Sequence, residues 1–163
     1  MRILHILNHI QEIGNGIVNV AVDLACLQAK DNHEVVVASA GGEYKALLAR
    51  YGVKHFDLDQ TRKPINLLKA AKRYWALVKE FQPDIVHAHM MTGIVLASIL
   101  RARAKYVLIS TVHNEFQRSA ILMGLADQVF QTSGKTQRVV VVWWRNHNNT
   151  EERPWPKQPR SRL

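Results

Sequence analysis

Two histidines lie two residues apart in the stretch "PDIVHAH", which runs from Pro83 to His89. The residues before them form a short apolar run without a helical period, which predicts a β-strand. Side chains two residues apart point to the same side of a strand. His87 and His89 could therefore ligate a metal ion, act as a catalytic pair, or pack in a core.

A third histidine, His113, follows the later apolar run "KYVLISTV". A metal site made of His87, His89 and His113 would need three ligands at about 2 Å from one ion, with partners that orient the rings. Neighbouring strands would permit such a site, but no Asp, Glu or Cys accompanies these histidines at the usual spacing. We therefore expect no metal site.

The place of each histidine in its strand separates their expected roles. His87, and His5 in the first apolar run, lie inside strands and are expected to be hydrogen-bonded core residues. His89 and His113 lie at strand ends, where ligand contact and a structural role are both open. Near neutral pH, a histidine there could share a proton with a hydroxyl group.

Apolar runs alternate with helical patterns over most of the chain, and this alternation must position the histidines. Strands are expected at residues 2–7, 34–39, 54–59, 84–89 and 105–113. Helices are expected at 17–29, 41–52, 64–82 and 92–104, the third with Leu68, Ala71, Trp75 and Val78 on its apolar stripe. Residues 119–130 are expected to form a further helical turn or two and the start of a sixth strand. Such alternation predicts an α/β fold, a Rossmann-like parallel sheet with helices on both faces. Ligands of such sheets bind at the carboxyl ends of the strands.

The bulk properties describe one soluble domain. The chain has 163 residues, and it contains neither an apolar run long enough to span a membrane nor a cleavage site after its first apolar stretch. The single cysteine, Cys26, falls in an apolar helical pattern and cannot form an internal disulfide. We therefore expect a cytoplasmic protein with Cys26 in its core.

The composition changes near residue 130. Residues 131–163 hold three of the five prolines, three of the four tryptophans, and seven Lys or Arg against two Glu, so they carry +5 of the net charge of +9. We therefore divide the chain into a Rossmann-like domain over residues 1–130 and an anomalous basic tail over residues 131–163, expected to be poorly ordered. Aromatic and basic residues also mix in single-strand nucleic-acid binders, but here the aromatics follow no regular platform. A non-native terminus, for instance from a shifted reading frame, is preferred.

Four stretches, in this order and spacing, resemble the N-terminal domain of the retaining GT-B-fold glycosyltransferases called glycosyltransferase family four. They are "MRILHIL", "GNGIVNVAVDLACLQAKDNHEVVVAS", "KEFQPDIVHAHMMTG" and "VLISTVHNEF", within residues 1 to about 129. The resemblance implies one half of a two-domain enzyme, in which this half binds the acceptor and the other binds most of the nucleotide-sugar donor. The sugar is transferred between them with retention of configuration. No cofactor and no catalytic metal are implied, because the nucleotide-sugar is a co-substrate.

The resemblance also implies a donor-side loop. Gly16, preceded by Asn15, matches the glycine loop that approaches the donor diphosphate, and backbone amides are suitable donors to phosphate oxygens. The loop departs from the family pattern in two places, because Asn15 replaces a glycine and Val18 stands where an acidic residue is common.

On the acceptor side, His113 matches the family histidine near the reacting sugar, and it is our candidate catalytic residue. His89 matches the end of an element that lines the acceptor side. Asn114 and Glu115 are further candidates to hold an acceptor, which the family leads us to expect to be a sugar or a lipid-linked sugar.

The largest departure from the family is the absence of a donor-binding C-terminal domain with its paired-glutamate motif. We therefore expect a fragment that is inactive alone, unless a separately encoded C-terminal half completes it, so whether this chain is itself an enzyme stays open. The alternative is a non-catalytic interaction domain or a basic nucleic-acid-associated domain, although nucleic acid is not a favoured partner.

The helix at 64–82 carries Lys69, Lys72, Arg73 and Lys79, which indicate a solvated face or a peripheral contact with anionic lipid at the inner face of the membrane.

Overall fold

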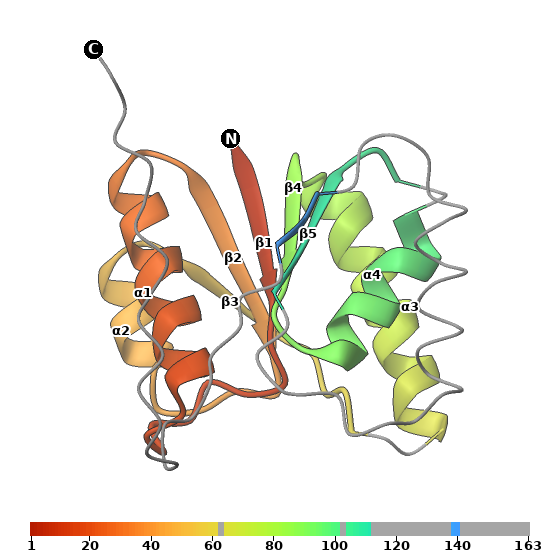
Figure 1. Cartoon of the computed structure of the whole chain (residues 1–163), viewed down its shortest axis with the longest axis horizontal. Coiled ribbons are helices and arrows are strands. Elements are labelled where there is room, and N and C mark those ends of the chain that lie inside the picture. Colours follow the sequence, from red (N-terminus) through yellow and green to blue (C-terminus); the bar gives the residue numbers. More distant parts are fainter. Residues whose placement is uncertain (62–63, 102–103, 112–137, 141–163) are drawn as a thin grey trace, which may run out of the picture.

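The fold is a parallel β-sheet covered by helices on both faces (Figure 1). The computed structural model describes residues 1–61, 64–101, 104–111 and 138–140. The strands are β1 (Arg2–Ile6), β2 (Glu34–Ser39), β3 (Lys54–Asp57), β4 (Ile85–Ala88), β5 (Val107–Thr111) and β6 (Arg138–Val140). The helices are α1 (Gly16–Lys30), α2 (Lys45–Arg50), α3 (Pro64–Phe81) and α4 (Met91–Arg101). The predicted α/β fold class is confirmed, while the helical turns and the start of a sixth strand expected at 119–130 lie outside the described residues.

The strands follow the order β3-β2-β1-β4-β5-β6, and every neighbouring pair is parallel. The first strand in the chain is therefore in the interior of the sheet. The chain adds β2 and β3 on one side of β1, then crosses over to add β4 and β5 on the other. The strand β6 pairs with β5 and comes from the part of the sequence that we treat as the tail.

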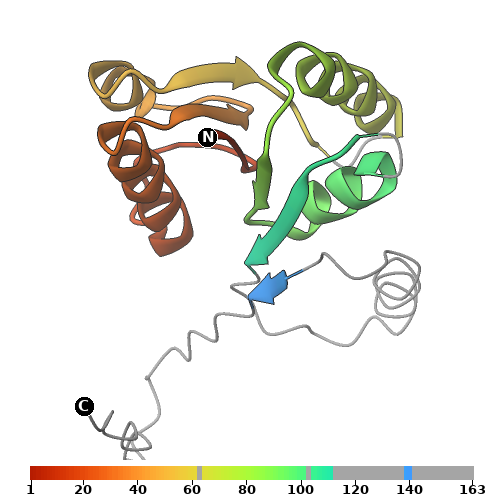
Figure 2. The ribbon, with the colours of Figure 1, turned by 90° about the horizontal axis from the view of Figure 1, so that it is seen from above.

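Each face of the sheet has its own apolar core. Figure 2 shows α1 and α2 on one side of the sheet and α3 and α4 on the other. One core packs Val18, Val22 and Leu48 of α1 and α2 against alternate residues of β1 and β2. The other packs Tyr74 and Leu77 of α3, with residues of α4, against the remaining residues of these strands and β4. The sheet is thus buried on both sides, which explains its nearly continuous apolar strands.

The buried stripe of α3 differs from the predicted one. The structure buries Ala70, Tyr74, Leu77 and Val78, whereas Leu68 is 62% exposed. The apolar spacing correctly predicted a helix, but the face that turns inward is set by Tyr74. Its hydroxyl donates to the hydroxyl of Tyr106, which in turn donates to the carbonyl of Ala97 in α4. This bonded pair fixes α3 and α4 against the start of β5.

Candidate functional site

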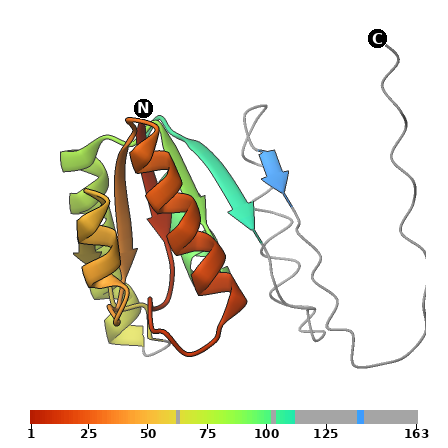
Figure 3. The ribbon, with the colours of Figure 1, turned by 90° about the vertical axis from the view of Figure 1, so that its left-hand side faces the viewer.

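The strand order reverses between β1 and β4, and ligands of open α/β sheets bind at the carboxyl ends of the strands at such a point. We call this region the carboxyl edge: the loop after β1 (residues 7–15), the start of α1, and His89 to Gly93 after β4. Figure 3 shows that the first turn of α1 lies at the same end of the sheet as the end of β1. The topology therefore brings together segments that are far apart in the sequence.

The start of α1 is exposed at Gly16, while the amide of the following residue is capped by a side chain. Asn15 is the N-cap, and its side-chain oxygen accepts a hydrogen bond from the amide of Ile17 at 3.0 Å. A Cβ atom added to Gly16 would meet nothing within 4 Å. The first helical amides and the positive end of the helix dipole therefore face open space, which is the arrangement that binds anions.

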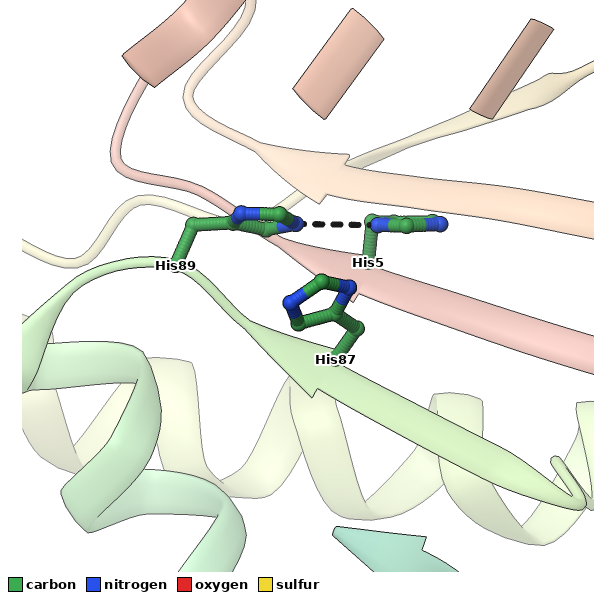
Figure 4. Close-up of side chains that lie close together, drawn as sticks. All are labelled: His5, His87 and His89. Carbon is green, nitrogen blue, oxygen red and sulfur yellow. Dashed lines mark hydrogen bonds between the residues drawn. The ribbon is translucent and has the colours of Figure 1, made fainter. Parts of the chain in front are cut away.

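Three histidines gather between β1 and β4 (Figure 4). His5 and His87 are register partners, so their side chains leave the same face of the sheet. The Nδ1 atom of His5 lies 3.0 Å from Nε2 of His89, and the ring centroids of His87 and His89 are 3.9 Å apart. We call His5, His87 and His89 the histidine cluster.

The hydrogen bonds of the histidine cluster fix one tautomer. Nε2 of His5 lies 2.7 Å from the side-chain oxygen of Gln28 in α1, which can only accept. His5 therefore donates through Nε2, and its Nδ1 accepts the proton of His89 Nε2. Nε2 of His87 lies 2.7 Å from the hydroxyl of Thr111 at the end of β5.

Burial partly reverses the expectation for these histidines. His5 is a fully buried core residue, as predicted, and its burial lowers its pKa to about 4, so its ring is neutral at pH 7. His87 is only half-buried, however, and His89, expected at the rim, is 2% exposed. The backbone amide of His89 still donates to the carbonyl of Ile6, so the hydrogen bonds between β1 and β4 continue one residue beyond β4. The side chain of His89 therefore turns inward toward His5.

Two oxygen atoms near the carboxyl edge have no hydrogen-bond partner within the described ranges, namely Oδ1 of Asn8 and Oε1 of Gln60. Gln60 is 5% exposed, and its Nε2 donates to the carbonyl of Leu7 at 2.8 Å. Its Oε1 would lie 3.5 Å from a Cβ atom placed on Gly93, in the first turn of α4. These oxygens can accept hydrogen bonds from hydroxyl groups.

The opposite edge of the sheet holds a cavity of about 390 Å³, lined by residues that include Arg2, Trp75, Lys79 and Lys105. The backbone amide of Arg2 donates to the carboxylate of Asp84 at 2.7 Å, which joins the starts of β1 and β4. Open parallel sheets bind their ligands at the other end of the strands. We therefore place the candidate site at the carboxyl edge and not in this cavity.

The structure brings Asn15, Gly16 and His89 to the carboxyl edge, while His113, Asn114 and Glu115 lie outside the described residues. Sequence reasoning placed His5 in the core but missed its contact with His89, and it missed Gln60 altogether. The contact between His5 and His89 follows from the pairing of β1 with β4, which residue spacing alone does not give. For Gln60, its position just after the third apolar run was the available signal.

The strand order, the helices on both faces and the open start of α1 define a Rossmann-like domain of the GT-B type. Solved GT-B glycosyltransferases share this fold. The glycosyltransferase from Rickettsia africae ESF-5 matches with a TM-score of 0.68 and 17% identity, over 86% of this chain and 36% of its own. The Anabaena protein Alr3699/HepE, solved with UDP and glucose, matches with a TM-score of 0.60 and 15% identity, over 86% of this chain and 44% of its own.

A third structure, that of MurG from Acinetobacter baumannii, matches with a TM-score of 0.57 and 14% identity, over 93% of this chain and 43% of its own. The chain therefore spans less than half the length of each of these proteins. The sequence model of Glycosyltransferase Family 4 matches residues 14–150, and the chain belongs to this family. No curated protein matches the chain.

In the part of the chain that the structure describes, no helix combines the length and the apolar character needed to cross a membrane.

Proposed function

We propose that this chain supplies the acceptor-binding N-terminal domain of a glycosyltransferase that moves a sugar from a nucleotide-sugar to an acceptor with retention of configuration. Membership in Glycosyltransferase Family 4 supports the class of reaction. The observation that carries the proposal for this chain is the carboxyl edge, where the open start of α1 lies at the same end of the sheet as the unpartnered oxygens of Asn8 and Gln60.

The start of α1 is the proposed contact for the diphosphate of the donor. In any α-helix the first amides have no intrahelical hydrogen-bond partner, and the helix dipole adds positive potential at this end. Because a Cβ atom on Gly16 would meet nothing within 4 Å among the described residues, their packing does not require the glycine. We infer that it leaves room for the phosphate groups to approach the backbone.

The acceptor side is proposed to consist of Asn8 and Gln60 together with the segment around His89. Both oxygens are buried acceptors without a partner in the described residues, and we infer that a small opening of the edge lets sugar hydroxyl groups supply the donors that they need. His89 is buried, so its proposed part is to hold the edge in place through His5 rather than to offer an open surface. The proposal retains His113 as the catalytic residue beside the reacting sugar, with Asn114 and Glu115 as acceptor contacts.

Sugar transfer is proposed to need a second, donor-binding domain that faces the carboxyl edge. The chain covers 36% and 44% of the glycosyltransferases from Rickettsia africae and Anabaena. These 163 residues alone would then bind acceptor sugars but would not transfer sugar. A C-terminal half, encoded in the same or a separate reading frame, would complete the enzyme.

A peripheral membrane contact through α3 is proposed for a lipid-linked acceptor. Lys69, Lys72, Arg73 and Lys79 are all exposed on this helix. Ile65 and Leu68, near the start of the same helix, are 70% and 62% exposed. Exposed basic and apolar side chains on one helix are the combination that binds anionic bilayer surfaces.

Saturation-transfer NMR of the chain tests the sugar proposal, with hexoses, hexose disaccharides and UDP-glucose as probes. We expect saccharide signals that Asn8→Ala removes, because this variant deletes an oxygen that has no partner in the described part of the chain. We expect Gly16→Val to weaken the signals of UDP-glucose while the saccharide signals stay. Ala76→Leu, which adds similar bulk on the exposed face of α3, should change neither. Absence of any saccharide signal from the unmodified chain would contradict an acceptor-binding domain.

A further inference from the structure

The histidine cluster has a geometry that holding the carboxyl edge in place, its proposed structural role, does not require. One ligand nitrogen from each of His5, His87 and His89 lies within 4.8 Å of the other two. The cluster joins two neighbouring strands, because His5 belongs to β1 and the other two come from β4 and the residue after it. Nitrogen atoms that converge in this way are the first requirement of a metal site.

Two of the three rings are oriented by oxygen atoms on their outer sides. Nε2 of His5 donates to Gln28, and Nε2 of His87 is bonded to the hydroxyl of Thr111, each at 2.7 Å. Histidines that ligate metals usually bond their second nitrogen in this manner, which fixes the tautomer and the ring plane. Figure 4 shows that the other nitrogen of each of these two rings is turned toward the interior of the cluster.

The distances are close to those of a coordinated ion. Two imidazole nitrogens bound at 2.0–2.1 Å to a tetrahedral ion lie about 3.3 Å apart. The observed separation between His5 Nδ1 and His89 Nε2 is 3.0 Å, so a small outward movement would admit an ion. All separations in the cluster lie within 4.8 Å, so none must shorten by more than about 1.5 Å to reach the separation of two coordinated nitrogens. His87 can make this movement because it is half-buried.

We propose that His5, His87 and His89 together bind one divalent transition-metal ion of the zinc class. Imidazole ligands favour Zn²⁺, Co²⁺ or Ni²⁺ over Mg²⁺ and Ca²⁺, which prefer oxygen. The ion replaces the proton that His89 shares with His5, and this proton moves from Nε2 to Nδ1 of His89, so the ring stays neutral. The third histidine is therefore His5 and not His113, and the site revises the expectation of no metal.

The bound ion would cross-link β1 and β4 at the centre of the sheet. This inference goes beyond the proposed sugar transfer, because no step of that transfer uses the ion. Binding of sugars and binding of metal are separate measurements on the same chain. Either one can fail while the other succeeds.

Titration of the untagged 163-residue chain with Co²⁺, followed by visible absorption and by displacement with Zn²⁺, tests the proposal. We expect one ion per chain and a rise in Tm on addition of Zn²⁺. His87→Ala should lower the affinity at least tenfold, and Gln28→Met, which removes an orienting partner, by about 10- to 100-fold. His33→Ala, a histidine change outside the cluster, should leave the affinity unchanged.

Far-UV circular dichroism of each variant shows whether the fold is retained, and Gln28→Met gives a second reading because it leaves all three ligands in place. Equal Co²⁺ affinity in the His87→Ala, Gln28→Met and unmodified chains overturns the proposal. So does the absence of saturable binding of Co²⁺ and Zn²⁺ by the unmodified chain.

Discussion

Single residues of one type behave differently here according to what surrounds them, as a partly buried histidine outside the histidine cluster shows. His55 in β3 lies with Nε2 2.8 Å from the hydroxyl of Ser39 and with Nδ1 3.5 Å from the carboxylate of Asp57. Its partial burial, with Lys45 nearby, lowers its pKa below the ordinary value of 6.5, although Asp57 acts in the opposite direction. The folded protein therefore takes up this proton less readily than the unfolded chain does.

This shift predicts how stability depends on pH. Above pH 6.5, His55 is neutral in both states and its contribution to the free energy of unfolding is constant. As the pH falls below 6.5, the unfolded chain binds the proton first, so the stabilisation that neutral His55 provides is lost. Urea unfolding of wild type and His55→Gln between pH 8 and pH 5 should show a smaller decrease for the variant. If the free energies of unfolding of wild type and variant fell in parallel below pH 6.5, the lowered pKa of His55 would be contradicted.

The residues of the candidate site were only partly predictable. The spacing of "HAH" placed His87 and His89 on one face correctly, since that follows from strand geometry. Their burial could not be read from position in the strand, because it depends on which helices cover that part of the sheet. Gln60 was not predicted, because its position just after a strand is only a weak signal. Gln60 is held at the site by its hydrogen bond to the carbonyl of Leu7, which lies 53 residues earlier in the chain.

At the scale of elements, Gly42 in the loop after β2 and Gly16 at the start of α1 have opposite structural demands. Gly42 has φ of +148°, and a Cβ atom there would collide with the backbone of Ile10. The two loops touch because Ile10 donates to the carbonyl of Gly41 and its own carbonyl accepts from Tyr44. Gly42 therefore lets the loop after β2 approach the loop after β1.

We predict that Gly42→Ala lowers the free energy of unfolding by about 1–3 kcal/mol from backbone strain alone, and by more if the loops separate. Gly16→Ala is the matched control, because its Cβ atom meets open space and its φ is not positive. Its effect should stay within about 1 kcal/mol and could be stabilising at a helical position. Guanidinium unfolding measures both variants, and equal losses would mean that the close approach at Ile10 has no energetic weight.

The elements themselves were largely predictable, because apolar runs and helical spacing depend on local sequence. Predicted and observed strands agree to within about two residues at most ends, and α3 begins and ends close to its predicted limits. What the periodicity did not fix was the rotation of α3. That rotation depends on the hydroxyl pair of Tyr74 and Tyr106, whose partners come from different elements.

At the scale of the whole molecule, the net charge of +9 favours binding to any anionic surface. The proposed membrane contact instead attributes lipid binding to the basic residues of α3. We predict that the chain floats with vesicles that contain anionic phospholipid at low salt and is released at high salt, because salt screens exposed charges. Lys69→Glu with Lys72→Glu should abolish flotation. Lys30→Glu with Lys105→Glu, which has the same net charge but lies outside α3, should not. Equal loss in both double variants would assign the attraction to net charge instead of α3.

The strand order has a consequence for the time at which the protein can fold during synthesis. The strand β1 leaves the ribosome first, yet its second neighbour is β4, and the amide of Arg2 bonds a carboxylate 82 residues later. Until residue 88 has emerged, β1, β2 and β3 can associate, but one hydrogen-bonding edge of β1 stays open to other chains. A nascent chain that stalls between β3 and β4 would therefore expose this apolar edge, and the crossover through α3 is the step that closes it.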